Sequence, residues 1–66
     1  MDRIKIGKRL RDLRGAKYTQ EQLAKEMGTS VSAVGMYERG ERMPSDDIKV
    51  KYSQLFGVSV QSLFFD

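Results

Sequence analysis

Apolar residues recur along the chain at helical spacing, in segments that are separated by glycines and helix-capping residues. In the first segment, Ile6, Leu10 and Leu13 stand at positions i, i+4 and i+7, which places them on one side of a helix. Gly15 is placed to end this helix, because glycine readily adopts the conformation that closes a helix C-terminus. Lysine and arginine occupy the other sides. The pattern therefore predicts an amphipathic helix with a basic outer surface.

The next two segments predict short helices that are joined by a tight turn. Thr19 is a suitable N-cap with Gln22 three residues later, as in a capping box, and Gly28 is expected to end the helix. Ser30 is the expected N-cap of the following helix, which stops at Gly40. The turn is therefore confined to residues 28–30. The residues expected to face inward are Leu23, Ala24, Met27, Val34 and Tyr37.

Two more helices are predicted after a loop over residues 40–44. Ser45 can cap the first, and Asp46 and Asp47 place negative charge in its first turn, where the helix dipole favours it. Gly57 ends this helix, and Ser59 can cap a short final one. The apolar positions of the two helices are Ile48, Tyr52 and Leu55, then Val60, Leu63 and Phe64. Because no segment alternates with period two, we expect an all-α fold of five short helices in one domain, residues 1–66.

The composition narrows the possible functions. The chain has 66 residues, 39% of them hydrophobic and 32% charged, but neither cysteine nor histidine. A thiolate metal site and histidine acid–base chemistry are therefore excluded. Asp46 and Asp47 do not form a carboxylate pair for metal binding or catalysis, because neighbours on a helix point about 100° apart, and capping explains them better. We expect no enzymatic activity, cofactor, metal or small-molecule substrate. No apolar run reaches membrane-spanning length, so we expect a soluble cytoplasmic protein without a membrane partner.

Positive charge is concentrated at one end of the chain. Residues 1–18 contain seven lysines and arginines but two acidic residues, whereas residues 19–66 contain five basic and seven acidic residues. A basic end together with a pI near 9.5 is typical of a protein that binds a polyanion, most simply nucleic acid. The alternative is a solvated helix face whose charge only keeps the protein soluble.

Two short helices around a tight, glycine-containing turn are what a DNA-binding helix-turn-helix requires. The chain resembles the phage repressor and Cro type of helix-turn-helix protein, also called XRE-like, in the stretches IGKRLRDLR, TQEQLAKEMGTSVSAVGMYERG and PSDDIKVKYSQLFGVSVQSLF. The resemblance covers nearly the whole chain. It implies a lambda-repressor-like domain that regulates transcription, in the bacterial cytoplasm near the nucleoid. Its recognition helix, over about residues 30–39, would enter the major groove of double-stranded DNA.

The resemblance also implies roles for individual residues. Gln20 corresponds to a glutamine that touches the DNA backbone and braces the recognition helix, and Glu38 and Arg14 correspond to a structural ion pair. Arg39 and Arg42 flank the end of the recognition helix, and Lys8, Arg9 or Arg11 would approach a phosphate if the basic face of their helix turned toward the DNA. The candidate DNA-binding residues are Thr19, Gln20, Ser30, Val31, Ser32, Gly35, Met36, Arg39 and Arg42.

The expected base-reading face lacks the side chains that discriminate bases most strongly. No arginine, asparagine or glutamine stands among Ser30, Val31, Ser32, Gly35 and Met36, so bidentate pairing with guanine or adenine is missing from these positions. The valine and methionine can pack on thymine methyl groups, and the serines can bond a base edge or a phosphate. The alternative is that the valine and methionine face a protein rather than DNA.

The C-terminal residues are more apolar than a core of this size is expected to hide. In the family the corresponding end forms a homodimer, which would place two recognition helices on a palindromic operator. The candidate dimerisation residues are Val58, Leu63, Phe64 and Phe65. The alternative is that the phenylalanines complete the core of the monomer. A DNA-binding repressor is the leading interpretation, and a protein-interaction module or antitoxin with the same fold is the alternative.

Overall fold

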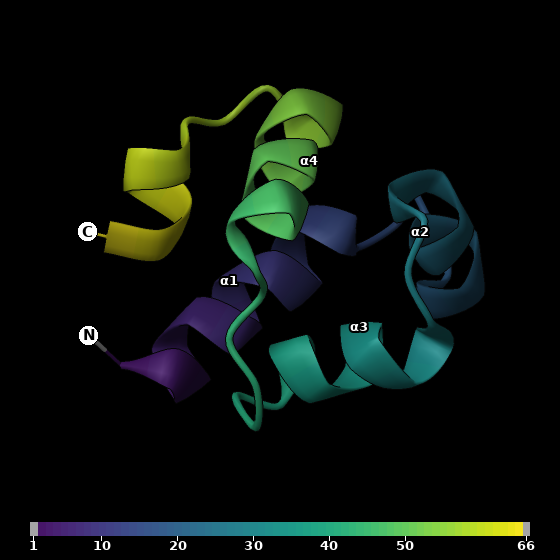
Figure 1. Cartoon of the computed structure of the whole chain (residues 1–66), viewed down its shortest axis with the longest axis horizontal. Helices are drawn as coiled ribbons and strands as arrows, with labels where there is room; N and C mark the ends of the chain where they lie inside the picture. The colour runs from purple at the N-terminus through teal and green to yellow at the C-terminus, as the bar shows by residue number, and fades with distance from the viewer. Residues whose placement is uncertain (1, 66) are drawn as a thin grey trace.

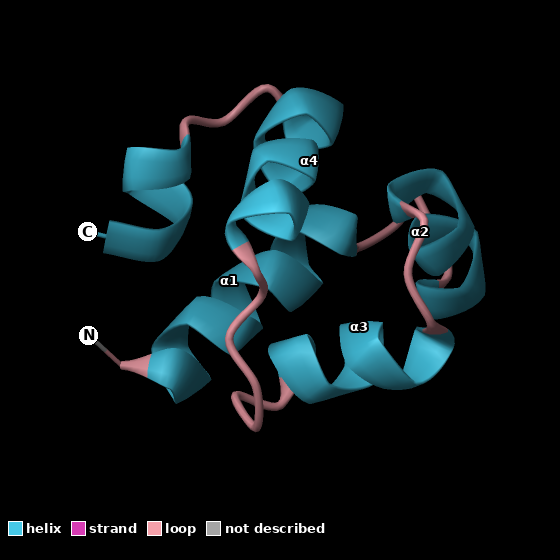
Figure 2. Cartoon of the chain, viewed as in Figure 1, coloured by secondary structure: helices cyan, strands magenta, loops and turns pink. Residues whose placement is uncertain are grey.

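Every regular element in the computed structural model, which describes residues 2–65, is a helix. The elements are α1 (Arg3–Arg14), α2 (Gln20–Met27), α3 (Val31–Glu38), α4 (Asp46–Phe56) and a C-terminal π-helical turn (Gln61–Phe65). Figure 2 shows these helices joined by short loops, with no strand in the described part of the chain. The predicted all-α fold of five short helices is confirmed.

Local sequence signals fix most helix ends as predicted. At the start of α2, the Thr19 Oγ1 atom accepts the N–H of Gln22 at 3.1 Å, and the Gln22 Oε1 atom accepts the N–H of Thr19 at 2.9 Å. Ser30 and Ser45 cap α3 and α4 through their hydroxyl oxygens. Gly28 ends α2 in the left-handed conformation, at φ 67°, which costs glycine no steric strain. The capping box and the three serine and threonine caps are therefore confirmed.

One helix end closes as the sequence predicts, and another was not predicted. The last residue of α3 is Glu38, and the helix stops at Gly40, where the N–H of Glu41 bonds to the carbonyl of Met36 at 2.9 Å. Gly40 has φ 74°, and a Cβ there would lie 2.8 Å from the Cα of Ile4, so glycine is needed both for the turn and for the approach to α1. At the other end of the chain, Asp2 caps α1.

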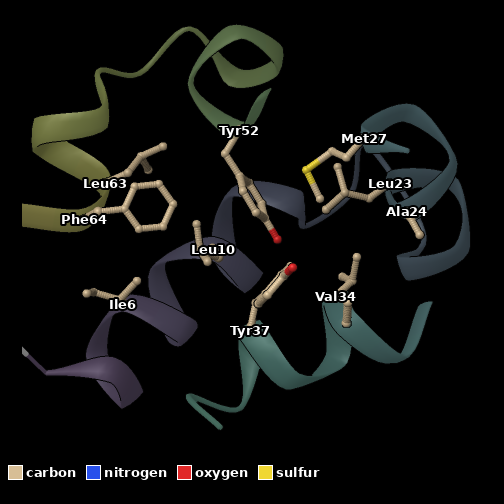
Figure 3. Packing of buried hydrophobic residues seen from close by; sticks show 11 residues of the cluster. Ile6, Leu10, Leu23, Ala24, Met27, Val34, Tyr37, Tyr52, Leu63 and Phe64 are labelled. Atoms are coloured by element: carbon tan, nitrogen blue, oxygen red, sulfur yellow. The ribbon is translucent and has the colours of Figure 1, made fainter. Parts of the chain in front are cut away.

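The helices surround one core, whose arrangement Figure 1 shows. The α1 helix packs against α3 and the C-terminal turn, and α2 packs against α3 and α4. Tyr52 lies at the centre of the core, with aromatic contacts to Tyr37 and Phe64 (Figure 3). Its ring also stacks on that of Phe56. The buried apolar residues are Ile6, Leu10, Leu23, Ala24, Met27, Ala33, Val34, Tyr37, Tyr52, Leu63 and Phe64.

The C-terminal segment completes the core of the single chain. Leu63 and Phe64 are almost fully buried, whereas Phe65 is 49% exposed. The guanidinium of Arg9 holds the segment against α1, because its Nη1 atom donates to the carbonyls of Ser62 at 2.8 Å and of Leu63 at 2.9 Å. Of the expected dimerisation residues, Leu63 and Phe64 are therefore core residues and offer no surface to a partner. The Nη1 atom of Arg9 is likewise committed to the C-terminal turn.

The buried hydroxyl of Tyr52 makes stability depend on pH. It has no hydrogen-bond partner among residues 2–65, and burial raises its pKa above the ordinary value of 10.0. The unfolded chain therefore loses this proton at a lower pH than the folded chain, so the stabilisation is complete below about pH 10 and is lost as the pH rises further.

Tyr52→Phe is expected to remove this alkaline loss. Because the variant also deletes an unpaired buried hydroxyl, its free energy of unfolding at neutral pH should equal or exceed the wild-type value by up to about 1 kcal/mol. Urea unfolding followed at neutral pH and above pH 10 measures both effects. Tyr18→Phe, at a half-buried position, is the control. An unchanged alkaline decline in Tyr52→Phe would contradict the assignment.

Candidate nucleic-acid interface

The turn between α2 and α3 is short and held at both ends. Gly28 takes the left-handed conformation, and the N–H of Thr29 bonds back to the carbonyl of Ala24 at 2.9 Å. Lys51 of α4 reaches across and donates from Nζ to the carbonyl of Met27 at 2.9 Å. A lysine at a helix C-terminus satisfies a free carbonyl and complements the helix dipole. The end of α2, from which α3 departs, is therefore fixed to the core.

The α3 helix has a buried side and an outward side. Val34 is fully buried and Tyr37 is 5% exposed, as the sequence predicts. Val31 is 42% exposed, Ser32 is exposed and Met36 is half-buried on the other side of the helix. Figure 1 shows α3 at the edge of the molecule, with α2 beside its first turn. The outward side therefore presents a short stripe of side chains that the core does not use.

Arg39 covers a glycine in this stripe. Gly35 is buried although it lies one turn from exposed Ser32, because the Arg39 side chain turns back over it. The Nε atom of Arg39 donates to the Oε2 atom of Glu41 at 2.6 Å, and its Nη2 atom approaches Oε1 at 3.4 Å. This pairing raises the pKa of Arg39 and lowers the pKa of the Glu41 carboxyl. Arg39 was a predicted contact residue, whereas Glu41, two positions away, was not predicted from the sequence.

A buried polar cluster ties α3 to both preceding helices. Glu38, whose side chain is 4% exposed, accepts from Arg14 Nε at 2.6 Å and from Arg14 Nη2 at 3.0 Å. The amide of Gln20 donates to the same carboxylate at 3.0 Å. The hydrogen bonds with Glu38 raise the pKa of Arg14. The structural pair of Arg14 and Glu38 is confirmed, and Gln20 braces α3 through Glu38.

An open hollow lies beside the start of α2 and the first residue of α3. It has a volume of about 560 Å³, and its walls come from the loop after α1, the first turn of α2 and Val31. Lys17 and Gln20 line it, and Thr19 forms part of its rim through the N-cap of α2. The hollow therefore combines the positive side chain of Lys17, the negative side chain of Glu21 and a helix N-terminus, next to the outward stripe of α3.

Comparison with known proteins identifies the family. Residues 8–63 of the chain match the family model described as helix-turn-helix. The chain belongs to this helix-turn-helix family. The matched range includes α2, the turn and α3, together with most of α1, all of α4 and part of the C-terminal turn. The resemblance carried by the sequence motifs is thereby confirmed.

Similar proteins of this helix-turn-helix family are transcriptional regulators. The uncharacterised HTH-type transcriptional regulator YazB of Bacillus subtilis is 43% identical over 58 residues, which are 86% of this chain and 84% of YazB. The HTH-type transcriptional regulator ImmR of the same organism is 36% identical over 61 residues, and the chain spans about half of its length, 48%. The family is one of DNA-binding regulators and not of enzymes.

A solved structure has the same fold over nearly its whole length. The restriction-modification controller protein C.AhdI from Aeromonas hydrophila matches with a TM-score of 0.83 and 41% sequence identity, covering 96% of this chain and 93% of C.AhdI. At this identity both the fold and the family are shared. Within residues 2–65 of the helix-turn-helix chain, no helix is long and apolar enough to cross a membrane, and no cluster of three acidic side chains could hold a metal ion.

Proposed function

We propose that this helix-turn-helix protein binds double-stranded DNA sequence-specifically and represses transcription, with α3 in the major groove. The observation that carries the proposal is the division of α3 into a fixed inner side and an exposed outer side. Val34, Tyr37 and Glu38 hold the helix against the core, and Val31 and Ser32 are exposed. A helix that is held rigidly by one side can present the other to base edges without rearrangement.

The hollow beside α2 supports a contact with the DNA backbone. The capping box of Thr19 leaves N–H groups of the first turn of α2 free to meet a phosphate, and Lys17 adds positive charge. Gln20 has one amide hydrogen committed to Glu38 and can offer the other to the same phosphate. Exposed Ser30 and Arg42 are further candidates for backbone contacts.

In this proposal, the side chains on the outward stripe of α3 contact the bases. Val31 and Met36 offer apolar contact to thymine methyl groups, and the Ser32 hydroxyl can bond either a base or a phosphate. We expect Ser32→Ala and Met36→Ala to change which sequences are preferred. Arg42→Ala is the matched comparison, because loss of a phosphate contact should weaken binding to all sequences and lower the salt slope by about one.

Selection from a random duplex pool, followed by binding across a salt series, tests these expectations. Uniform losses on every sequence from the Ser32 and Met36 variants would contradict the base-reading assignment. Enrichment of an inverted repeat with half-sites about 10 base pairs apart would support a homodimer, whose surface would include exposed Phe65 and half-buried Val58. Failure to enrich any sequence would favour a protein-interaction module with the same fold.

A further inference from the structure

The guanidinium of Arg39 lies over the outward stripe of α3, whose own positions carry no arginine. A Cβ placed on Gly35 would lie 2.9 Å from the Nη1 atom of Arg39 and 3.7 Å from its Cζ and Nη2 atoms. The guanidinium therefore rests against the backbone of Gly35, one helical turn nearer the N-terminus than the Cα of Arg39. Any larger residue at position 35 would occupy this place. The N-terminal part of a recognition helix is the part that meets base edges.

Glu41 holds the guanidinium by one edge and leaves another edge open. The bond from Arg39 Nε to Glu41 Oε2, at 2.6 Å, and the longer contact from Nη2 use the edge beside the side-chain stem. The terminal edge, formed by Nη1 and Nη2, keeps two parallel N–H groups. The side chain as a whole is 59% exposed, and its Nη1 atom has no hydrogen-bond partner among residues 2–65. Two parallel donors are what a bidentate contact requires.

We propose that Gly35 and Glu41 are positioning residues that aim Arg39 at a guanine in the major groove, an inference that rests on the proposed DNA binding. Gly35 provides the space in which the guanidinium lies, and Glu41 fixes its rotation. Arg39 reads the guanine through its terminal edge, which matches the O6 and N7 acceptors of that base.

The neighbouring carboxylate favours a base over a phosphate as the partner of Arg39. Glu41 offsets the charge of Arg39 and would repel a phosphate that approached the same guanidinium. A guanine edge carries acceptors without a net charge, so this repulsion is much weaker there. A fixed orientation also matters more for a base, because its two acceptors must both be aligned.

The test compares Gly35→Ala, Glu41→Gln and Arg39→Lys with the wild-type protein. In Gly35→Ala the added methyl meets only the far end of a flexible side chain, so the fold is retained while the guanidinium is displaced. Random-pool selection identifies the site, and fluorescence anisotropy then measures the affinity for that duplex and for versions changed at each base pair. Glu26→Gln is the matched charge control, since Glu26 is exposed on α2 and makes no ion pair among the described residues.

The expected result is a selective loss at a single base pair. Wild-type protein should prefer guanine there by about ten-fold or more, and all three variants should lose most of that preference while retaining discrimination elsewhere. If Glu41 acted only through its negative charge, Glu41→Gln would bind every sequence more tightly, as Glu26→Gln is expected to do. A uniform gain of that kind, with the guanine preference intact, would overturn the inference.

Failure of the two proposals can be distinguished. If the wild-type protein enriches a site and the Gly35 and Glu41 variants keep its full base preference, the positioning role is wrong and DNA binding stands. If the wild-type protein enriches no site, both proposals are overturned. Thermal melting of each variant, monitored by circular dichroism, is expected to show wild-type folding, so that a lost preference reports the position of Arg39.

Discussion

Gly7→Ala is expected to remove more than half of the free energy of unfolding of the protein. A Cβ on Gly7 would lie 2.5 Å from the carbonyl oxygen of Glu38 and 2.8 Å from that of Tyr37, so α1 and α3 would have to separate. Both obstacles are backbone atoms and cannot rotate away. Overpacking of this kind costs about 3 kcal/mol, while a core this small supplies about 3 to 5 kcal/mol. Urea unfolding followed by circular dichroism measures the loss.

Gly35→Ala is the matched control for this prediction. Both glycines lie inside helices, so alanine improves the helix propensity of both by a similar amount. At Gly35 the nearest atom belongs to the mobile end of Arg39, and we expect a urea midpoint at or above that of the wild-type protein. If Gly7→Ala unfolded at the wild-type midpoint, the close approach of α1 and α3 would not be required for folding.

Glu38→Ala should lower the free energy of unfolding by about 3 kcal/mol. The change leaves Arg14, whose side chain is only 16% exposed, without its carboxylate partner, and it removes the acceptor of Gln20. Loss of one partner of a buried pair is costly because the remaining charge stays desolvated, although partial exposure of the arginine keeps the cost near the lower end of the usual range. Urea denaturation at neutral pH gives the value.

A second pair in the same protein provides the control. Arg39 and Glu41 also approach to 2.6 Å, but their side chains are 59% and 54% exposed. Glu41→Ala should therefore leave the urea midpoint nearly unchanged, because water replaces the lost partner. Equal losses from the Glu38 and Glu41 variants would show that burial does not set the strength of the Glu38 cluster. A double-mutant cycle with Glu38→Ala and Arg14→Ala would then measure the interaction energy between these two side chains.

Helix positions were predictable because their signals are local. The side chains of Thr19 and Gln22 reach each other across one turn, and the serine caps bond to N–H groups three residues away. Asp2 caps α1 by the same rule but was missed, since the residues before Ile6 carry no apolar periodicity that would indicate where the helix begins. The close approach of Gly40 to α1 depends on residues that are distant in the chain, so it could not be derived in this way.

Contacts between distant residues account for the remaining differences. The sequence makes Arg9 a candidate phosphate ligand. In the structure its guanidinium donates to backbone carbonyls near the C-terminus, 53 and 54 positions away in the chain. The same packing buries Leu63 and Phe64, which the apolar C-terminus and the resemblance to the family assigned to a dimer surface. Gly7 offers no local signal at all, because only the crossing of α1 and α3 shows why a side chain is excluded there.

The candidate site was predicted in part. The inward positions of Val34 and Tyr37 correctly indicated which side of α3 is exposed, because helical geometry alone fixes the opposite side. The buried pair of Arg14 and Glu38 followed from the resemblance to the family. The fold of Arg39 over Gly35 could not follow from either source, since it depends on a side-chain rotamer and on the Glu41 carboxylate.

The division of α3 into two sides has an evolutionary consequence. The buried cluster around Glu38 and the apolar residues beneath the helix hold the scaffold, whereas Val31 and Ser32 make no contribution to the core. Mutations at the latter positions can therefore accumulate at little cost in stability. Under the proposed function, a gene duplicate of this protein could therefore acquire a new DNA sequence preference through a few substitutions, and a designer could change the preference in the same way.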